Sequence, residues 1–378
     1  MKAEAFARQI QKAGIRTITG VPDSTLKQFC SYLNTGGRDV FEGHIVAANE
    51  GAAVGIAIGE YLATGRPACV YMQNSGLGNA VNPVTSLANR EVYGIPVLFV
   101  IGWRGEPGTE DEPQHRFMGK VTLGLLELMG IPYAVIDART TGEELEGFLG
   151  RAQECFRDGR QFALVVKKGT FAKEENTAYE NGWTMQREDA IEAVARWLQP
   201  DDIVVSTTGK ISRELYEKLD EIKGSHSQAF LTVGGMGHAG MIACQLARRN
   251  PGRKVVCLDG DGAILMHMGS LAVIGELSPA NLIHICLNNG AHESVGGMPT
   301  GAAGMLYSEI AERCGYAKTY RVAKQDGLED ALSQIRGCGK MIFLEINVAN
   351  GSREDLGRPK ETAEDNKKAF MECLGRRE

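Results

Sequence analysis

The stretch Gly260-Asp261-Gly262, followed by the pair Asn288-Asn289, decides the fold of this chain. An apolar strand is expected over Val255–Leu258, just before the first glycine, and another over Leu282–Leu287, just before the asparagines. Between these strands, Met266–Leu277 has the pattern of a helix. Two strands joined through a helix form a parallel pair. We therefore expect Asp261 and the asparagines to lie side by side at the carboxyl ends of the strands, where open α/β sheets bind ligands.

This arrangement indicates a site for a metal ion and a diphosphate. A carboxylate and amide oxygens suit a hard cation such as Mg²⁺, which completes its shell with phosphate oxygens and water. The glycines let the backbone approach a diphosphate closely. Gly-Asp-Gly alone is an ordinary turn after a strand, and Asn-Asn-Gly alone is an ordinary loop. Their combination on neighbouring strands, with 25 residues between them (263–287), favours the metal site.

The composition is typical of a soluble globular protein, with 378 residues of which 43% are hydrophobic and 23% charged. A net charge of −6 with mixed signs argues against nucleic acid as the main partner. No apolar run has the length of a membrane span, and the N-terminus lacks the apolar core of a signal peptide. The nine cysteines form no Cys-x-x-Cys pair and several lie in apolar strands. We therefore expect reduced thiols in a cytoplasmic protein, without a structural zinc site.

Short strands rich in Val and Ile alternate with helices, and this pattern occurs twice along the chain. Continuous apolar strands separated by helices indicate parallel sheets covered on both faces. We therefore predict an α/β fold of two doubly wound parallel-sheet domains, 1–170 and 185–378, joined by a polar linker at 171–184. A last helix over Thr362–Leu374 is expected to pack on its own domain or on a neighbouring subunit. The predicted strands are Thr17–Val21, Val40–Ala47, Ala68–Met72, Val97–Ile101, Tyr133–Ile136, Phe162–Val166, Ile203–Ser206, Ala229–Val233, Val255–Leu258, Leu282–Leu287, Thr319–Val322 and Ile342–Ile346.

A glycine-rich turn at 234–240 supports a different class of protein. Gly235-x-Gly237-x-x-Gly240 follows a predicted strand and opens a helix, as in NAD-binding Rossmann proteins. Asp259 ends the next strand, 19 residues after Gly240, near where a ribose-binding acid would lie. However, this turn is not the first in its domain, and Asp259 leads directly into Gly-Asp-Gly. The asparagine pair would also have no role in dinucleotide binding.

The Gly-Asp-Gly and Asn-Asn pair resembles the signature of thiamine-diphosphate (ThDP) enzymes. The resemblance implies ThDP and Mg²⁺ as cofactors, held by a pyrimidine-binding (Pyr) domain at 1–170 and a diphosphate-binding (PP) domain at 185–378. Asp261, Asn289 and the backbone carbonyl of Ala291 are the implied metal ligands, while Asn288 would brace the turn. The residues implied to touch the diphosphate are Thr208, Gly209, Gly260, Gly262 and Ala263.

The same resemblance gives roles to two further segments. Glu50, within Asn49-Glu50-Gly51-Ala52-Ala53, matches the family's glutamate that activates ThDP through its aminopyrimidine ring. Without the resemblance, Glu50 would be an ordinary acid at a helix N-terminus. In the turn after Val233, Met236 is implied to wedge between the two rings of the cofactor, and the carbonyl of Gly234 to hold its amino group. Otherwise Met236 would be a core residue.

Segments along the whole chain resemble the phosphonopyruvate decarboxylase family more closely. That family converts 3-phosphonopyruvate, a 2-keto acid with a phosphonate head group, into phosphonoacetaldehyde and carbon dioxide in phosphonate biosynthesis. Sulfopyruvate decarboxylase, which shares the fold and cofactor, is the alternative. The segments are Gly20-Val21-Pro22-Asp23-Ser24, Asn74-Ser75-Gly76-Leu77-Gly78-Asn79, Asp111-Glu112-Pro113-Gln114-His115, Ser206-Thr207-Thr208-Gly209-Lys210 and, most specific, Asn288-Asn289-Gly290-Ala291-His292-Glu293-Ser294-Val295-Gly296-Gly297.

This closer resemblance implies the remaining site residues. Asp23 and His115 would be acid–base groups at the mouth of the site, although Asp23 could simply cap a helix starting near Ser24. Arg104, His115 and His292 would bind the phosphonate, and Asn74 would contact the cofactor. In this family the glutamate-bearing domain of one subunit faces the diphosphate domain of another. The resemblance therefore implies a homo-oligomer, at least a dimer, with active sites at subunit interfaces.

Overall fold

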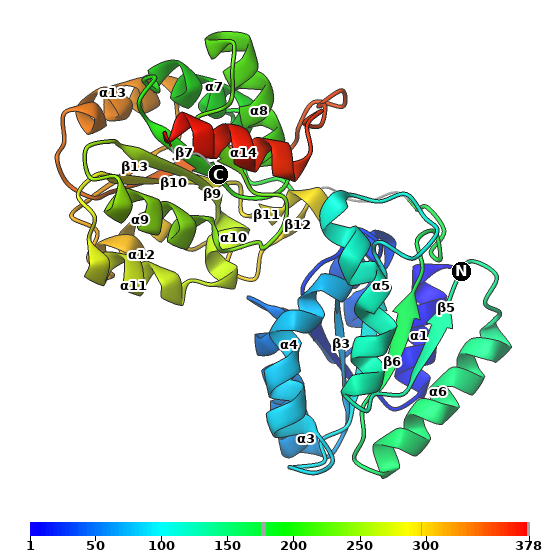
Figure 1. Cartoon of the computed structure of the whole chain (residues 1–378). Helices are drawn as coiled ribbons and strands as arrows, with labels where there is room; N and C mark the ends of the chain where they lie inside the picture. Colours follow the sequence, from blue (N-terminus) through cyan, green and yellow to red (C-terminus); the bar gives the residue numbers. More distant parts are fainter. Residues whose placement is uncertain (175–178, 296, 376–378) are drawn as a thin grey trace. The chain divides into compact units, whose positions relative to one another are not determined.

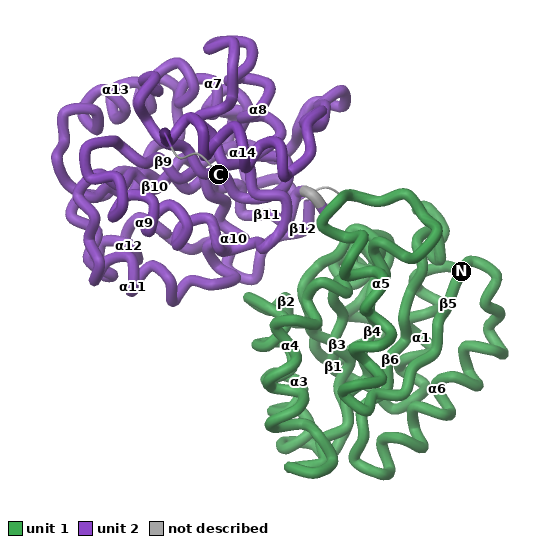
Figure 2. Tube along the Cα trace, viewed as in Figure 1, with its two compact units in different colours: residues 1–178 green, residues 179–378 purple. Residues whose placement is uncertain are grey.

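A computed structural model describes residues 1–174, 179–295 and 297–375. The chain forms two compact units, Met1–Ala178 (unit 1) and Tyr179–Glu378 (unit 2), as Figure 2 shows. Of the predicted linker, residues 175–178 lie outside the described residues, and so does Gly296 of the most specific family segment. Among the described residues, no helix has both the length and the apolar character needed to cross a membrane.

Unit 1 is a six-stranded parallel sheet in the order β2-β1-β3-β4-β6-β5, with helices on both faces (Figure 1). Its strands are β1 (Thr17–Gly20), β2 (Gly43–Val46), β3 (Ala68–Gln73), β4 (Val97–Gly102), β5 (Tyr133–Ile136) and β6 (Phe162–Val166). Its helices are α1 (Ala3–Lys12), α2 (Lys27–Thr35), α3 (Glu50–Thr64), α4 (Leu77–Pro83), α5 (Pro113–Leu128) and α6 (Gly142–Arg157).

Unit 2 contains a second six-stranded parallel sheet, in the order β13-β14-β10-β9-β7-β8, and a short antiparallel hairpin. The sheet strands are β7 (Ile203–Ser206), β8 (Ala229–Leu231), β9 (Val255–Gly260), β10 (Leu282–Asn288), β13 (Lys318–Val322) and β14 (Ile342–Asn347), and the hairpin is β11 (Ala291–His292) with β12 (Met298–Pro299). The helices are α7 (Arg187–Trp197), α8 (Lys210–Lys223), α9 (Ala239–Arg249), α10 (Asp261–Met266), α11 (Gly269–Leu277), α12 (Tyr307–Arg313), α13 (Gln325–Arg336) and α14 (Ala363–Cys373).

The two sheets share one topology. When the strands of each unit are counted in chain order, both sheets read second, first, third, fourth, sixth, fifth. The chain therefore changes direction across the sheet between β1 and β3 in unit 1, and between β7 and β9 in unit 2. Ligands of open α/β sheets bind at such a switch point, at the carboxyl ends of the strands.

The continuous apolar strands are explained by burial on both faces. In β9, Val256 and Leu258 pack in a core with α7, α8 and α13, whereas Val255 and Cys257 pack in a second core with α9, α11 and α12. A strand such as β9 therefore needs apolar side chains on both of its faces. The two-domain α/β prediction is confirmed.

Several predicted boundaries were wrong. The second strand begins at Gly43, because Gly37–Asp39 form a 3₁₀ turn. The helix expected over Met266–Leu277 begins only at Gly269 (α11), because Met266 ends a separate helix, α10, and the chain breaks at His267 (φ −132°, ψ 43°). Of the two expected positions for the last helix, α14, the structure has the first: it packs on its own unit, where Phe370 contacts Phe230 with ring centroids 5.7 Å apart.

Candidate active site

The loop that follows β10, residues 288–292 (the metal loop, after its expected ligand), lies beside Asp261 as predicted. Leu287 pairs with Gly260 in the parallel register of β10 and β9, so Asn288 and Asp261 follow at the same edge of the sheet. Asp261 is the first residue of α10 and is only 3% exposed. Its Oδ2 has no hydrogen-bond partner among the described residues. A buried carboxylate oxygen without a partner is costly, and a cation would satisfy it, so the site fits Mg²⁺.

The two asparagines have different tasks. Asn288 donates from Nδ2 to Glu345 at 2.8 Å and accepts from the backbone N–H of Gly290 at 3.1 Å. Asn288 therefore braces the turn, as expected. Asn289 donates from Nδ2 to Glu293 at 3.0 Å, while its Oδ1 accepts from the N–H of Ala291 at 3.0 Å. These two bonds fix which way the Asn289 amide faces.

The electrostatics of Asp261 also favour a cation. Burial raises the pKa of Asp261 to about 7, against the opposing effect of the backbone N–H groups of Asn289 and Gly262. The nearby Glu345 carboxylate raises it further. A bound cation would stabilise the ionised form and reverse this shift.

Two glycines in the loops expected at the diphosphate have different structural reasons, a left-handed backbone at Gly209 and limited space at Gly262. Gly209, which precedes α8, has φ +98° and ψ −140°. At Gly262, an added Cβ would lie 3.3 Å from the ring of His292 and 3.5 Å from the methyl carbon of Met236. Glycine at 262 therefore keeps open the space between these side chains and the start of α10. Thr208 is half-buried and Ala263 is buried beside them.

The turn that carries Met236 packs tightly on the same place. Gly235 and Gly237 have φ of +61° and +90°, in the region that favours glycine. A Cβ at Gly237 would lie 2.9 Å from the carbonyl oxygen of Ala263 and 2.5 Å from the ring of His267. Met236 itself is half-buried, so it is not a core residue.

His292 is a neutral group rather than a cation. It is 8% exposed, and burial lowers its pKa to about 4. Its Nε2 has no hydrogen-bond partner in the part of the chain that the structure describes. The side chain can therefore offer a ligand one hydrogen bond, but no positive charge near neutral pH.

Glu50 of unit 1 lies at the strand–helix junction, as predicted. It is the first residue of α3, and the side chain of Asn49 caps that helix by accepting from the N–H of Ala52 at 2.8 Å. Glu50 is 5% exposed, and its Oε2 accepts a hydrogen bond from Asn79 Nδ2 at 2.7 Å. An added Cβ at Gly76 would lie 2.4 Å from Oε1 of Glu50. The carboxylate therefore rests against the Gly76 backbone.

Replacing Gly76 by alanine should displace the Glu50 carboxylate, because the new methyl group cannot fit beside it. We expect kcat to fall by about 10²-fold, the scale of a misplaced catalytic group. Gly78→Ala is the matched control, because a Cβ there meets no atom of the described chain within 4 Å. Steady-state rates of both variants provide the measurement. Equal activity of the two variants would show that the position of Glu50 does not matter.

Asp23 caps a turn inside the core of unit 1. It is fully buried and accepts from the N–H groups of Thr25 and Leu26 at 2.8 and 3.1 Å, and from Gln73 Nε2 at 2.7 Å. Burial raises the pKa of Asp23, although the bond from Gln73 opposes this. The following helix starts at Lys27 rather than near Ser24. A capping role accounts for the two bonds from backbone N–H groups, whereas an acid–base role for Asp23 stays a prediction.

Asn74 and Arg104 are tied to unit 1 by several bonds. Asn74 is fully buried, donates to the carbonyl of Arg104 and to Thr122 Oγ1, both at 2.9 Å, and accepts from the N–H of Arg104 at 3.2 Å. The Arg104 guanidinium binds Asp111 through two nitrogens and donates to Ser24 at 2.7 Å. Burial alone would raise the pKa of Asp111, but the Arg104 side chain lowers it well below its usual range. In this structure Asn74 holds the Arg104 backbone in place. A contact between Asn74 and the cofactor stays a prediction.

His115 lies on the first turn of α5, which begins at Pro113. Its side chain is half-buried. Burial and the nearby charge of Arg104 lower its pKa to about 4. His115 is therefore neutral at neutral pH and can accept a proton more readily than it can donate one.

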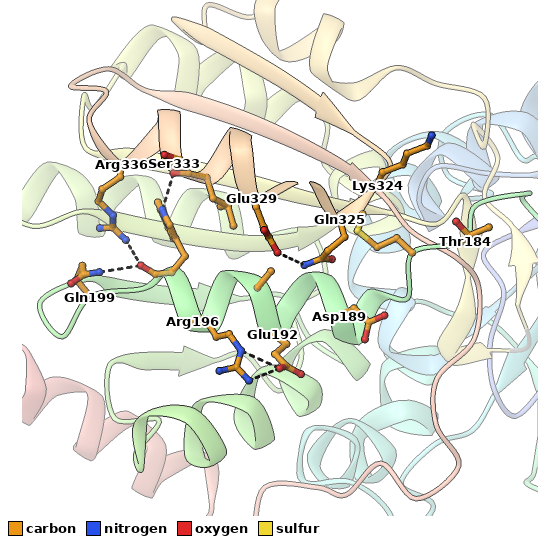
Figure 3. A pocket seen from close by; sticks show the side chains of 14 residues that line it. Thr184, Asp189, Glu192, Arg196, Gln199, Lys324, Gln325, Glu329, Ser333 and Arg336 are labelled. Atoms are coloured by element: carbon orange, nitrogen blue, oxygen red, sulfur yellow. Dashed lines mark hydrogen bonds and ion pairs between the residues drawn. The ribbon is translucent and has the colours of Figure 1, made fainter. Parts of the chain in front are cut away.

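A groove away from these residues is one alternative location for a site. It has a volume of about 1040 Å³ and lies between α7 and α13 of unit 2 (Figure 3). Arg336 stacks over Trp197 in its wall. Its lining includes Glu192, Arg196 and Lys324 but none of the residues at the metal loop. The strand-end loops, rather than this groove, therefore hold the candidate site.

Comparison with known proteins agrees with the geometry. Residues 2–123 match the family described as thiamine pyrophosphate enzyme, N-terminal TPP binding domain, and residues 207–346 match the C-terminal TPP binding domain. Phosphonopyruvate decarboxylase from Streptomyces viridochromogenes is 36% identical, covering 92% of this chain and 89% of that protein. The enzyme of the same name from Streptomyces hygroscopicus is 34% identical, over 92% and 87%.

Two more distant proteins complete the comparison. Sulfopyruvate decarboxylase from Methanosarcina acetivorans is 28% identical over 87% of this chain and 88% of that protein. The crystal structure of benzoylformate decarboxylase from Polynucleobacter necessarius is 12% identical, covers 93% of this chain and 100% of that chain, and has a TM-score of 0.39. This last likeness is too low to carry an argument.

The two sheets, whose strand ends carry Glu50 and Asp261, are thus the two domains of a ThDP-dependent enzyme. Within this class the chain belongs to the phosphonopyruvate decarboxylase family, and it is a decarboxylase, that is, a carboxy-lyase. This membership decides against the NAD-binding alternative.

Sequence reasoning missed three residues that shape the site. Gly76 and Asn79 contact Glu50, and both lie in the family segment at 74–79. Glu293 contacts Asn289 and lies in the segment at 288–297. Their places in these segments could have drawn attention to them, but their contacts could not be predicted from spacing.

Proposed function

We propose that this chain converts 3-phosphonopyruvate to phosphonoacetaldehyde and carbon dioxide in phosphonate biosynthesis, using ThDP and Mg²⁺. The observation that carries the proposal is the buried Oδ2 of Asp261, which lies beside Asn289 and has no partner among the residues that the structure describes, in a chain of this family. When bound, ThDP supplies the electron sink that decarboxylation of a 2-keto acid requires.

The residues of unit 2 would hold the diphosphate end of the cofactor. Asp261, Asn289 and the backbone carbonyl of Ala291 would bind Mg²⁺, which suits oxygen ligands. Met236 would support the two rings, and the carbonyl of Gly234 would accept from the amino group. The groups proposed to contact the diphosphate are the side chain of Thr208 and the backbone at Gly209, Gly260, Gly262 and Ala263.

The residues of unit 1 would act on the pyrimidine ring and the substrate. Glu50 would hydrogen-bond a ring nitrogen of the cofactor, with Gly76 and Asn79 fixing its carboxylate. His115 would accept or return a proton at the substrate. Arg104 would supply positive charge to the phosphonate, and His292 of unit 2 would add a hydrogen bond as a neutral group.

The choice of substrate is tested with two 2-keto acids. A phosphonate carries nearly two negative charges at neutral pH and a sulfonate carries one. We expect kcat/KM for 3-phosphonopyruvate to exceed that for sulfopyruvate by about tenfold or more. Rates with both compounds, measured on one preparation with ThDP and Mg²⁺, decide the question. Faster turnover of sulfopyruvate would reassign the substrate and leave the reaction class unchanged.

We also propose a homo-oligomer, at least a dimer, with each active site shared between subunits. Helices α3 and α11 are apolar on nearly all sides, which is typical of buried helices. Yet Leu62 of α3 is 73% exposed and Val273 of α11 is 50% exposed. A second subunit covering these faces would account for both.

Shared sites predict complementation between inactive variants. Glu50→Gln and Asp261→Asn disable different units, so a mixed dimer would contain one site with both natural residues. The two variant dimers are dissociated, mixed in equal amounts and allowed to reassociate. Random exchange makes about half of the dimers mixed, and each mixed dimer has one intact site of two, so about a quarter of wild-type activity should return. Mixed dimers that stay inactive would contradict shared sites.

We further propose a cytoplasmic location. All nine cysteines are free thiols and six of them are buried, as is usual in a reducing compartment. Cell fractionation tests this location, and recovery outside the cytoplasm would contradict it.

A further inference from the structure

Glu293 joins three elements around the metal loop. It begins a 3₁₀ turn directly after β11 and lies four residues after Asn289. Its carboxylate accepts from three side chains, and its exposed fraction is 10%. The donors are Asn289 Nδ2 at 3.0 Å, Lys210 Nζ at 2.8 Å and Arg187 Nη1.

Arg187 anchors this carboxylate in the body of unit 2. It donates from Nε and Nη2 to the two oxygens of Glu214, at 2.7 and 2.6 Å, and both side chains are almost fully buried. Two acids and two bases thus balance one another, which offsets the cost of their burial. Planar pairing of a guanidinium with a carboxylate also fixes its geometry. Arg187 and Asn289 both donate to Oε2 of Glu293, so the oxygen that Asn289 contacts is anchored by the buried ion pair.

This anchoring determines how Asn289 is presented. An asparagine amide can face either way, with its oxygen and nitrogen exchanged. In this loop the acceptor Glu293 requires the Nδ2 donor on its side, so Oδ1 must face the other side, where Ala291 also lies. Without Glu293, the amide could turn and direct a donor where a cation needs an oxygen.

Through its bond with Lys210, Glu293 also contacts the segment that follows the loop expected at the diphosphate. Lys210 is the first residue of α8, directly after Gly209. Its ammonium group is held between Glu293 and Ser352, whose Oγ accepts at 2.7 Å. One carboxylate thus connects the metal loop with the start of α8.

We propose that Glu293 is a positioning residue, which orients the Asn289 amide so that its oxygen faces Mg²⁺. The inference rests on the proposed function, because it requires a metal bound with ThDP. Groups that orient metal ligands without touching the metal typically change metal affinity by about 10- to 100-fold. Glu293 is placed to act in this way and is not itself a metal ligand.

The test is the affinity for Mn²⁺, measured by electron paramagnetic resonance at saturating ThDP. Glu293→Ala should weaken Mn²⁺ binding by about 10- to 100-fold. Glu293→Gln should stay within about threefold of wild type, because its carbonyl oxygen can still accept from Asn289. Both variants remove the same charge. Equal weakening in the two would therefore show a role in charge balance alone and would overturn the proposal.

A double variant covers the case in which Glu293→Ala does not fold. Lys210→Ala combined with Glu293→Ala removes one base and one acid, so the cluster remains neutral. The weak Mn²⁺ binding should persist in this protein, and recovery to wild-type affinity would overturn the proposal. Glu188→Ala is the control, since Glu188 pairs with Arg353 and Lys218 elsewhere in unit 2. If the wild type itself binds no Mn²⁺ with ThDP, the proposed function fails and the inference fails with it. If all variants bind Mn²⁺ as tightly as wild type, only the inference is overturned.

Discussion

Replacing Glu50 by glutamine lowers kcat by about 10²- to 10⁴-fold, the usual scale for loss of an acid–base group, and leaves the fold intact. Glutamine has the shape of glutamate and can still accept the hydrogen bond from Asn79. It cannot carry the charge or exchange the proton that the cofactor ring requires. Steady-state turnover at saturating ThDP and Mg²⁺ measures the loss, and thermal unfolding checks the fold.

A matched control lies on the same helix. Glu60 belongs to α3 but bonds to Thr64 rather than to any residue of the site. Glu60→Gln should therefore turn over like wild type. If Glu50→Gln also kept wild-type turnover, Glu50 would have no part in the reaction.

Replacing Asp261 by asparagine should weaken Mg²⁺ binding by about 100-fold or more, and ThDP binding with it. The variant keeps the size of the side chain but removes the charge on the buried Oδ2. Affinity for hard cations depends strongly on the number of charged ligands, and even indirect changes around a metal cost about 10- to 100-fold. Calorimetric titration with Mg²⁺ at saturating ThDP measures the effect, and unchanged affinity would remove Asp261 from the metal site.

In the metal-free protein, Asp261→Asn affects stability rather than metal affinity. Here the natural aspartate, and not the variant, is expected to be the less favourable residue near neutral pH. Burial raises the pKa of Asp261 from 3.8 to about 7. Between these values the folded state keeps a proton that the unfolded state has lost, so this contribution to stability is present at low pH and is lost as pH rises through about 7. The full contribution is on the order of 4 kcal/mol. Asp261→Asn lacks this dependence.

Urea unfolding of both metal-free proteins tests the sign. The free energy of unfolding of wild type, relative to the variant, should fall between about pH 4 and about pH 8. A relative stability that stays constant over this range would mean that the pKa of Asp261 is not raised in the metal-free protein.

The fold was largely predictable because the strands can be recognised from their own apolar residues, without knowledge of what packs against them. The central strands run through a region buried on both faces, so their residues are almost all apolar, as in β4 and β6. The helix at Asp261–Met266 was missed for the same reason. All six of its residues are buried, so it has no polar face and no helical periodicity to recognise.

The positions of Asp261 and Glu50 at strand–helix junctions were predictable, because each opens a helix shortly after a strand that can be recognised in the sequence. The contacts that orient these groups were not. Arg187 and Glu293 are 106 positions apart, and Asn74 and Arg104 are 30 apart, yet each pair is in direct contact. Such pairs depend on how loops from separate strands converge, and sequence spacing does not record that.

Calorimetric titration of the purified protein with ThDP, in the presence and absence of Mg²⁺, tests the central claim most directly. We predict saturable binding of ThDP that requires the cation, and no binding of NAD. Folded protein that takes up no ThDP with Mg²⁺ present would contradict the assignment of Asp261, Asn289 and Glu50 to a cofactor site.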